Sequence, residues 1–214
     1  MKKIGLTRTR VYRRLLAVDP SLTCTGWALF GIKNKRLIAV GKVRSLPSSE
    51  PLSERILDLQ GKINSIFESL SLGKNDILVC EAPTTMRDPG AAIKVEQVRG
   101  IFETVAREKQ AIVPGRINPR SVQRELMGFG GQQQARALVK ETAVRLVHTL
   151  YADDLTTLNF PTDLHRLSKH QDICDAILVG NLALVRVHSS LGADVPLSTV
   201  FEAPSPRYRR GLYK

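Results

Sequence analysis

Apolar residues in the first part of the chain gather in short runs, which is the pattern of buried β-strands. Runs at 14–19, 25–32 and 36–44 are separated by turn-forming residues and predict an antiparallel meander of three strands. DILVCE at 76–81 predicts a fourth strand, and AIVP at 111–114 a short fifth one. A sheet is therefore expected at the centre of the fold.

Between and after these runs, apolar residues recur with the spacing of α-helices. The first such segment runs from Leu52 to Phe67 and stops at Gly73. Further helices are predicted at 91–109, 119–127, 132–150 and 171–187. The remaining segments, at 82–90 and 151–169, are expected to be irregular. Alternating strands and helices indicate an α/β protein.

Length and composition predict one domain. The chain has 214 residues, of which 43% are hydrophobic, so residues 14–190 suffice for one α/β core between a basic arm at 1–13 and a basic tail at 191–214. Three unpaired cysteines indicate neither a disulfide framework nor a zinc module, and they suit a reducing, cytoplasmic compartment. No run approaches 20 apolar residues, so no association with a membrane is expected.

Four acidic residues are placed where a fold could bring them together. Asp19 and Glu81 each end a predicted buried strand, while Asp172 and Asp175 are three residues apart and share one face of a helix. Negative charges about 4–5 Å apart repel by roughly 3–4 kcal/mol per pair, so such a cluster needs counter-charge. Mg²⁺ relieves this repulsion and is typically completed by waters and substrate phosphates.

The charge of the chain points to a polyanionic partner. Lys and Arg number 32 against 20 Asp and Glu, which leaves a formal charge of +12. A basic protein kept soluble by its charge, or one associated with the ribosome, has the same composition. The acidic cluster favours a nuclease, which needs positive charge for phosphates and local negative charge for metal ions.

Five segments in order resemble the RuvC family of Holliday junction resolvases, within the ribonuclease H-like superfamily. They are DPS…TGWAL from residue 19, ILVCE at 77–81, AIKVEQVRGIFETVA at 92–106, RSVQRELMGFGGQQQARALV at 120–139 and DICDAILVG at 172–180. The resemblance covers about residues 14–186. It implies a ribonuclease H-like fold with a mixed five-stranded central sheet flanked by helices.

The resemblance also implies an activity. Asp19, Glu81, Asp172 and Asp175 would hold two Mg²⁺ ions, with Mn²⁺ able to substitute, and a homodimer would cut four-way DNA junctions at symmetric positions. The expected location of the protein is the cytoplasm, the host-cell cytoplasm if the protein is viral, or an organelle. His170, close to these acids, is read either as a residue that orients a water or as an exposed helix start.

Departures from the family occur where DNA is contacted. Gln134 replaces a lysine of the family, so phosphate stabilisation is assigned to Arg136 or Lys140. Met86 stands in a loop where the family has an aromatic wedge, and it is either an apolar wedge or an ordinary loop residue. The expected DNA-contacting side chains are Met86, Arg99, Arg120, Arg124, Arg136 and Lys140. Asp153, Asp154 and Asp163 are read as turn residues, and Trp27 as a core residue.

Three other functions agree with the same residues. One is a phage-type nuclease that trims branched DNA during viral genome packaging, and another is a ribonuclease H-like hydrolase. The third, from a different class, is a nucleic-acid-binding module with a vestigial metal site, which the intact carboxylates disfavour.

Overall fold

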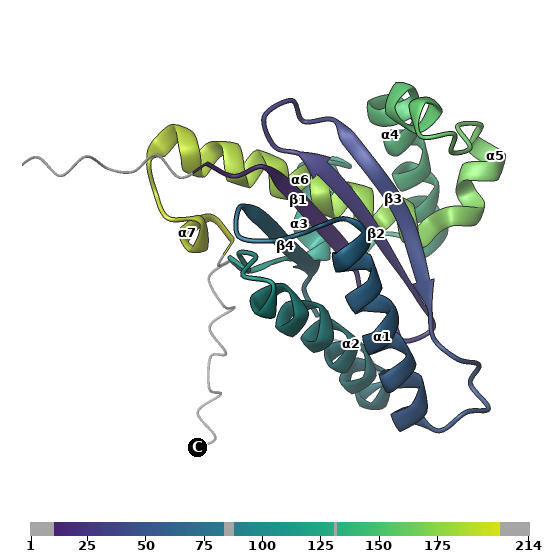
Figure 1. Cartoon of the computed structure of the whole chain (residues 1–214). Coiled ribbons are helices and arrows are strands. Elements are labelled where there is room, and N and C mark those ends of the chain that lie inside the picture. Colours follow the sequence, from purple (N-terminus) through teal and green to yellow (C-terminus); the bar gives the residue numbers. More distant parts are fainter. Residues whose placement is uncertain (1–10, 84–87, 131, 202–214) are drawn as a thin grey trace, which may run out of the picture.

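The computed structural model describes residues 11–83, 88–130 and 132–201, and its centre is a mixed sheet of five strands (Figure 1). The spatial order is β3-β2-β1-β4-β5. β1 pairs antiparallel with β2 and parallel with β4, which confirms the predicted mixed sheet. The strands are β1 (Arg14–Asp19), β2 (Cys24–Gly31), β3 (Leu37–Arg44), β4 (Asp76–Glu81) and β5 (Arg116–Ile117).

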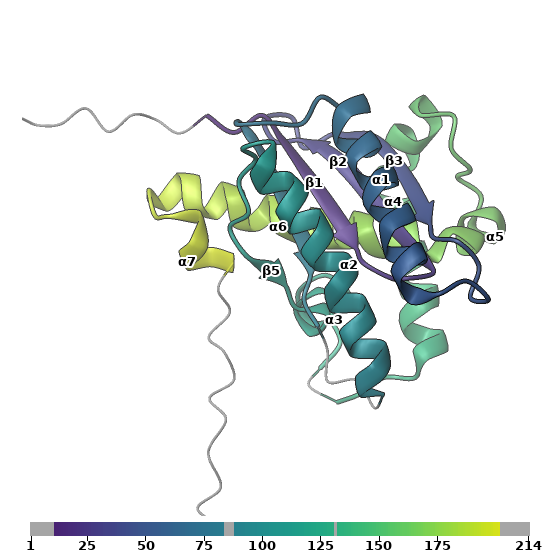
Figure 2. The ribbon, with the colours of Figure 1, turned by 60° about the horizontal axis from the view of Figure 1, so that its bottom comes forward.

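Helices cover both faces of this sheet (Figures 1 and 2). On one face lie α1 (Leu52–Ser69) and α2 (Pro89–Glu108). The other face is covered chiefly by α6 (Gln171–Ala193), which contacts β1 and β2. Around α6 pack α3 (Pro119–Glu125), α4 (Arg136–Thr157) and α7 (Leu197–Phe201).

Strand β1 is apolar on both sides because the sheet is covered on both sides. Leu15 and Ala17 belong to the core beneath α6, whereas Leu16 and Val18 belong to the core beneath α1 and α2. Successive side chains of a strand point to opposite faces, so a two-sided core requires a continuous apolar run. The next residue, Asp19, therefore points to the α6 face.

Helix α6 is a core helix with unusually apolar composition. A window within Leu164–Ala193 is long and apolar enough to cross a membrane, but 56% of it is buried inside the protein. Gly180 carries no side chain where α6 meets β2, and a Cβ there would overlap the ring of Phe30. The apolar composition of α6 is thus explained by its place against the sheet.

The segment 151–169, predicted to be irregular, is largely helical. Helix α4 continues to Thr157 through a kink at Tyr151, and it is followed by α5 (Leu164–Leu167) and a 3₁₀ turn at Ser168–His170. Burial of Tyr151 and Leu155 explains the extension, because both side chains join the core beneath α6. The prediction missed it because polar residues interrupt the apolar pattern.

Two predicted boundaries were also wrong. The expected strand at 111–114 is reduced to a single bridge between Ile112 and Ile77, and β5 forms at Arg116–Ile117 instead. The folded unit extends past residue 190, because α7 places Leu197 and Phe201 in the core. Most of the predicted arm (1–10) and the end of the predicted tail (202–214) lie outside the described residues.

Asp154 is buried in α4 and is not the turn residue that its sequence context indicated. Its Oδ2 accepts a hydrogen bond of 2.8 Å from the backbone N–H of Leu37, and its other oxygen is paired with Arg36. Replacing Asp154 with Ala leaves that buried N–H without its partner, so we expect a loss of about 2 kcal/mol in the free energy of unfolding.

Urea unfolding of Asp154→Ala measures this loss, with Asp153→Ala as the matched control. Asp153 is the exposed neighbour, and its substitution is expected to change stability by no more than about 0.5 kcal/mol. Equal effects of the two substitutions would contradict the role assigned to Asp154.

Candidate active site

Two of the predicted acids end adjacent parallel strands. Val18 on β1 pairs with Cys80 on β4, and the next residues along are Asp19 and Glu81. Strands in a sheet lie about 4.8 Å apart, and residues in one row point to the same face. The two carboxylates therefore stand side by side at the edge where β1 and β4 end.

The other two acids are brought to the same place by α6. Gly26 on β2 is the partner of Asp19 in the β1–β2 ladder. A Cβ on Gly26 would overlap the backbone carbonyl of Asp172, so the first turn of α6 lies directly on the strand beside Asp19. Asp175 follows one turn later on the same helix face. We call Asp19, Glu81, Asp172 and Asp175 the carboxylate cluster.

The electrostatics of the cluster show how close its members are. Burial raises the pKa of Asp19 well above its usual value, and the charges of Glu81, Asp175 and Asp172 raise it further. Burial likewise raises the pKa of Glu81 to about 7 and that of Asp175 to about 6. Asp19, Glu81 and Asp175 thus lack both solvation and enough neighbouring positive charge.

The donor set suits a hard divalent cation completed by other ligands. Among the described residues, no three His, Cys, Asp or Glu side chains are arranged to hold one ion by themselves. Carboxylate oxygens are nevertheless what Mg²⁺ prefers, and Mg²⁺ usually keeps waters and substrate phosphates in its shell. Buried acids that raise one another's pKa fit such an ion, because its charge removes their repulsion.

Arg99 supports the cluster from behind and is not available to DNA. Its side chain is 1% exposed, its Nε donates a 2.7 Å hydrogen bond to the backbone carbonyl of Glu81, and it is paired with Glu96. Glu96 in turn lies 3.3 Å from Arg116. The expected phosphate contact of Arg99 is therefore wrong. Its charge lies within the protein and holds the end of β4.

The other predicted cations are exposed, but only two lie near the cluster. Arg136 and Lys140 on α4 both lower the pKa of Asp175, so their charges are close to it. Arg124 is paired with Glu125 at 3.2 Å, and Arg120 is exposed at the start of α3. Met86 lies outside the described residues.

Residues beside the predicted acids also contribute to the site. Gln171 donates a 3.0 Å hydrogen bond from Nε2 to Asp175, which keeps that carboxylate oriented. His170 is half-buried at the start of α6, with Nδ1 3.4 Å from the Nζ of Lys42 and its ring against Phe160. The spacing of Gln171 and Asp175, four residues apart on one helix, was the available signal for the first contact. Nothing in the sequence indicated the contact between His170 and Lys42.

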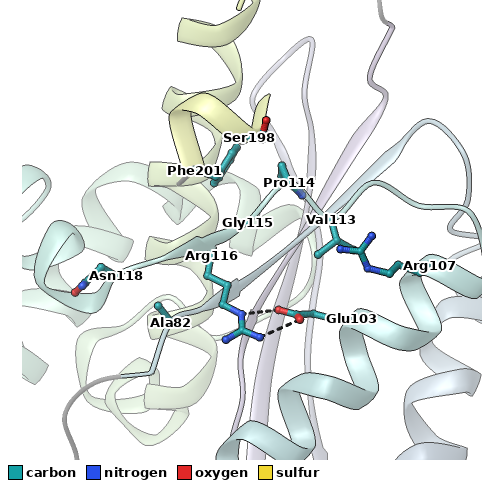
Figure 3. A pocket seen from close by; sticks show the side chains of 10 residues that line it. All are labelled: Ala82, Glu103, Arg107, Val113, Pro114, Gly115, Arg116, Asn118, Ser198 and Phe201. Atoms are coloured by element: carbon teal, nitrogen blue, oxygen red, sulfur yellow. Dashed lines mark hydrogen bonds and ion pairs between the residues drawn. The ribbon is translucent and has the colours of Figure 1, made fainter. Parts of the chain in front are cut away.

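A separate cavity lies on the β5 side of Glu81 (Figure 3). Its volume is about 520 Å³, and its lining includes Arg107, Arg116 and Phe201 but none of the carboxylate cluster. Arg116 donates to both carboxylate oxygens of Glu103, at 2.7 and 3.0 Å, so much of its charge is balanced within the protein. This cavity is therefore distinct from the candidate active site.

A mixed sheet whose neighbouring strands end in acids, closed by further acids on a helix, defines a nuclease of the ribonuclease H-like class. The family can be stated as well. The sequence model described as "Crossover junction endodeoxyribonuclease RuvC" matches residues 15–155, so the chain belongs to the RuvC family. The match ends before Asp172 and Asp175, which the fold alone places at the site.

Relatives and solved structures agree with this assignment. Crossover junction endodeoxyribonuclease RuvC of Parvibaculum lavamentivorans is 31% identical over 58% of this chain and 71% of its own, and that of Cereibacter sphaeroides is 27% identical over 59% and 74%. The structure "T. thermophilus RuvC in complex with Holliday junction substrate" has a TM-score of 0.60 at 16% identity, covering 84% of this chain and 98% of that one. The predicted ribonuclease H-like fold is thereby confirmed.

The raised pKa values predict that the cluster destabilises the folded protein increasingly as the pH rises from 5 to 8. Acids with a pKa near 4 when unfolded and near 6–7 when folded contribute stability that is full below about pH 4 and lost as the pH rises through 6–7. The free energy of unfolding in EDTA should therefore fall between pH 5 and 8. Asp19→Asn should be more stable than the parent at pH 8, and the difference should be smaller at pH 5.

Urea unfolding of the parent and Asp19→Asn across this pH range measures the effect. Asp153→Asn, which removes an exposed carboxylate, serves as the control and should follow the parent. A parent that is as stable at pH 8 as Asp19→Asn would show that the acids do not repel one another in the folded state.

Proposed function

We propose that this chain is a structure-selective endodeoxyribonuclease that cuts four-way DNA junctions at the carboxylate cluster. The observation that carries the proposal is the meeting of four acids, three of them with raised pKa values, at the ends of β1 and β4 and the start of α6. Membership of the RuvC family supports a junction as the substrate, since its relatives are named crossover junction endodeoxyribonucleases. The formal charge of +12 suits a DNA partner.

The proposed cofactor is a pair of Mg²⁺ ions, for which Mn²⁺ can substitute. Asp19, Glu81, Asp172 and Asp175 would hold them, with Asp19 shared because it lies between β4 and the start of α6. When bound, the ions supply a water activated for attack on the phosphate and stabilise the leaving 3′ oxygen. All four residues offer only oxygen ligands, as Mg²⁺ requires.

The chain's own residues orient the cluster and the substrate. Arg99 holds the backbone of Glu81, and Gln171 holds the carboxylate of Asp175, so neither acid needs to reorganise during the reaction. Arg136 and Lys140 lie near Asp175 with exposed side chains. We assign them to the scissile phosphate, because a cation beside the acids balances the charge of the approaching DNA.

A homodimer is the proposed assembly. Symmetric cuts in two strands of a junction require two active sites related by a two-fold axis. Helix α2 has an apolar side chain available for such contact, since Ile93 is 61% exposed. The proposed location is the cytoplasm, where bacterial and many viral DNA substrates are found.

The first test of the proposed function concerns Asp19, the central acid of the cluster. Asp19→Asn should reduce nicking of a synthetic immobile junction in Mg²⁺ by at least about 10³-fold, because it removes a ligand of the metal ions. Junction binding should be unchanged or tighter, since one negative charge is lost and the cations remain. Nick positions are mapped at nucleotide resolution, and the parent should cut two opposing strands at symmetric positions.

Its control is Asp153→Asn, which should nick like the parent. Three-way, flap and RNA/DNA hybrid substrates distinguish the trimming of assorted branched DNA and a ribonuclease H-like activity from junction resolution. Equal cutting rates on a plain hybrid would replace the resolvase assignment with the ribonuclease H-like one. Nicking by Asp19→Asn at the parental rate would overturn the assignment of the cluster.

The second test of the proposed function concerns Arg136. Because its charge lies beside Asp175, Arg136→Ala should lower the rate of nicking at saturating enzyme by about 10–100-fold while weakening binding by less than about threefold. Single-turnover kinetics separate the two effects. Arg145→Ala is the matched control, because Arg145 is exposed on the same helix and paired with Glu141 at 2.7 Å. Unchanged turnover in Arg136→Ala would assign the phosphate to another cation.

A further inference from the structure

Two cations on the open edge strand β3, Lys42 and Arg44, lie on the face of the sheet that carries the carboxylate cluster. A groove of about 780 Å³ between β3 and α1, with Trp27 and Gly41 in its lining, lies on the other face of the same strand. We propose that Lys42 and Arg44, here called the β3 cations, bind the sugar-phosphate backbone of a duplex arm of the DNA substrate. The proposal rests on the proposed function, since it extends the binding surface of the same enzyme beyond the carboxylate cluster.

The sheet register places Lys42 next to the cluster, because residues in one row point to the same face. Asp19 pairs with Gly26 on β2, and Gly26 pairs with Lys42 on β3, so these three residues form one row across the sheet. The backbone of Lys42 is therefore two strand spacings, about 10 Å, from that of Asp19. Gly26 has no side chain to stand between them. DNA held at Asp19 thus passes within reach of β3.

A second cation stands in the neighbouring row. Arg44 pairs with Cys24 in the β2–β3 ladder. Burial and Asp172 raise the pKa of the Cys24 thiol, whereas Arg44 lowers it, so Arg44 and Asp172 flank the same side chain. Lys42 and Arg44 hence border the carboxylate cluster on the β3 side, as Arg136 and Lys140 border it on the α4 side.

The charges of Lys42 and Arg44 are not balanced by ion pairs within the part of the protein that the structure describes. Over the described residues, Lys42 and Arg44 form no ion pair, and the nearest polar contact of Lys42 is His170 Nδ1 at 3.4 Å. Lys62 is paired with Asp58 at 2.7 Å, and it also donates a 2.9 Å hydrogen bond to the backbone carbonyl of Arg44. Two cations therefore remain available for phosphates, and a third braces the strand that carries them.

The β3 cations favour backbone contacts with a duplex over stacking with unpaired bases. The indole of Trp27 lies on the other face of the sheet, against Gly41, where a Cβ would overlap the ring, and it packs on the core beneath α1. Trp27 is therefore not placed to stack on a base held at Lys42 and Arg44, and these two side chains offer DNA their positive charge. Phosphate contacts of this kind position DNA without reading its sequence.

Charges on an edge strand also have a second use, because they prevent pairing with another sheet. That use alone would leave DNA affinity unaffected by substitution. The test is therefore a charge reversal, Lys42→Glu with Arg44→Glu, compared with Lys33→Glu with Lys74→Glu. Lys33 and Lys74 are exposed at the opposite end of the sheet, so the control has the same change in net charge.

Binding to a four-way junction and to a linear duplex is measured by fluorescence anisotropy in EDTA at several salt concentrations. We expect the Lys42/Arg44 reversal to raise Kd at least tenfold more than the control does on both DNAs. The slope of log Kd against log salt should fall by about 2, which corresponds to two lost phosphate contacts. Lys42→Arg should retain parental affinity.

Equal weakening by the two charge reversals, or an unchanged salt slope, would overturn the proposal. A loss of junction binding with parental binding to the linear duplex would overturn the assignment to a duplex arm. Thermal unfolding checks that both variants are folded, and the milder pair Lys42→Gln with Arg44→Gln should show the same effect in smaller size. Because binding is measured without cleavage, a parent that binds but does not nick refutes the proposed function and leaves the assignment of the β3 cations unaffected.

Discussion

Contact between the first turn of α6 and strand β2 is the constraint on which the active site depends. Gly26 makes this contact possible, because any side chain there would overlap the backbone of Asp172. Gly180 has the same function further along α6, against Phe30. With the helix pressed onto the sheet, Asp172 and Asp175 reach the strand end that carries Asp19.

The same contact forces negative charges together in a buried place. Burial and mutual repulsion raise the pKa values of three acids, so the site opposes folding while preparing a place for cations. The protein tolerates this through neighbouring cations and a hydrogen-bond donor. Arg99 lies behind Glu81, Gln171 holds Asp175, and Arg136 and Lys140 lower the pKa of Asp175. Function and stability are thus in direct opposition at the cluster.

Much of the fold was predictable because strong local patterns determine it. β1 and β4 are continuous apolar runs that end in acids, and the structure confirms both. Arg99 and Asp154 were misread for one reason. A charged residue on a helix is usually exposed, and only contacts with distant segments, at Glu81 and at Leu37, explain why these two are buried. The predicted end of the domain at residue 190 was wrong for a similar reason, because α7 is short and is held by its contact with α6.

The sequence by itself determined that β1 to β4 form, which acids end β1 and β4, and the periodicity that makes α6 a helix, because these depend on neighbours along the chain. Only the tertiary structure decided that the four acids meet and that Lys42 stands in the same row as Asp19. It also decided that Arg99 turns inward. The physical reason is that sheet register joins Asp19 to Lys42, 23 positions apart, and the approach of α6 to β2 joins Gly26 to Asp172, 146 positions apart. No local pattern encodes such pairings.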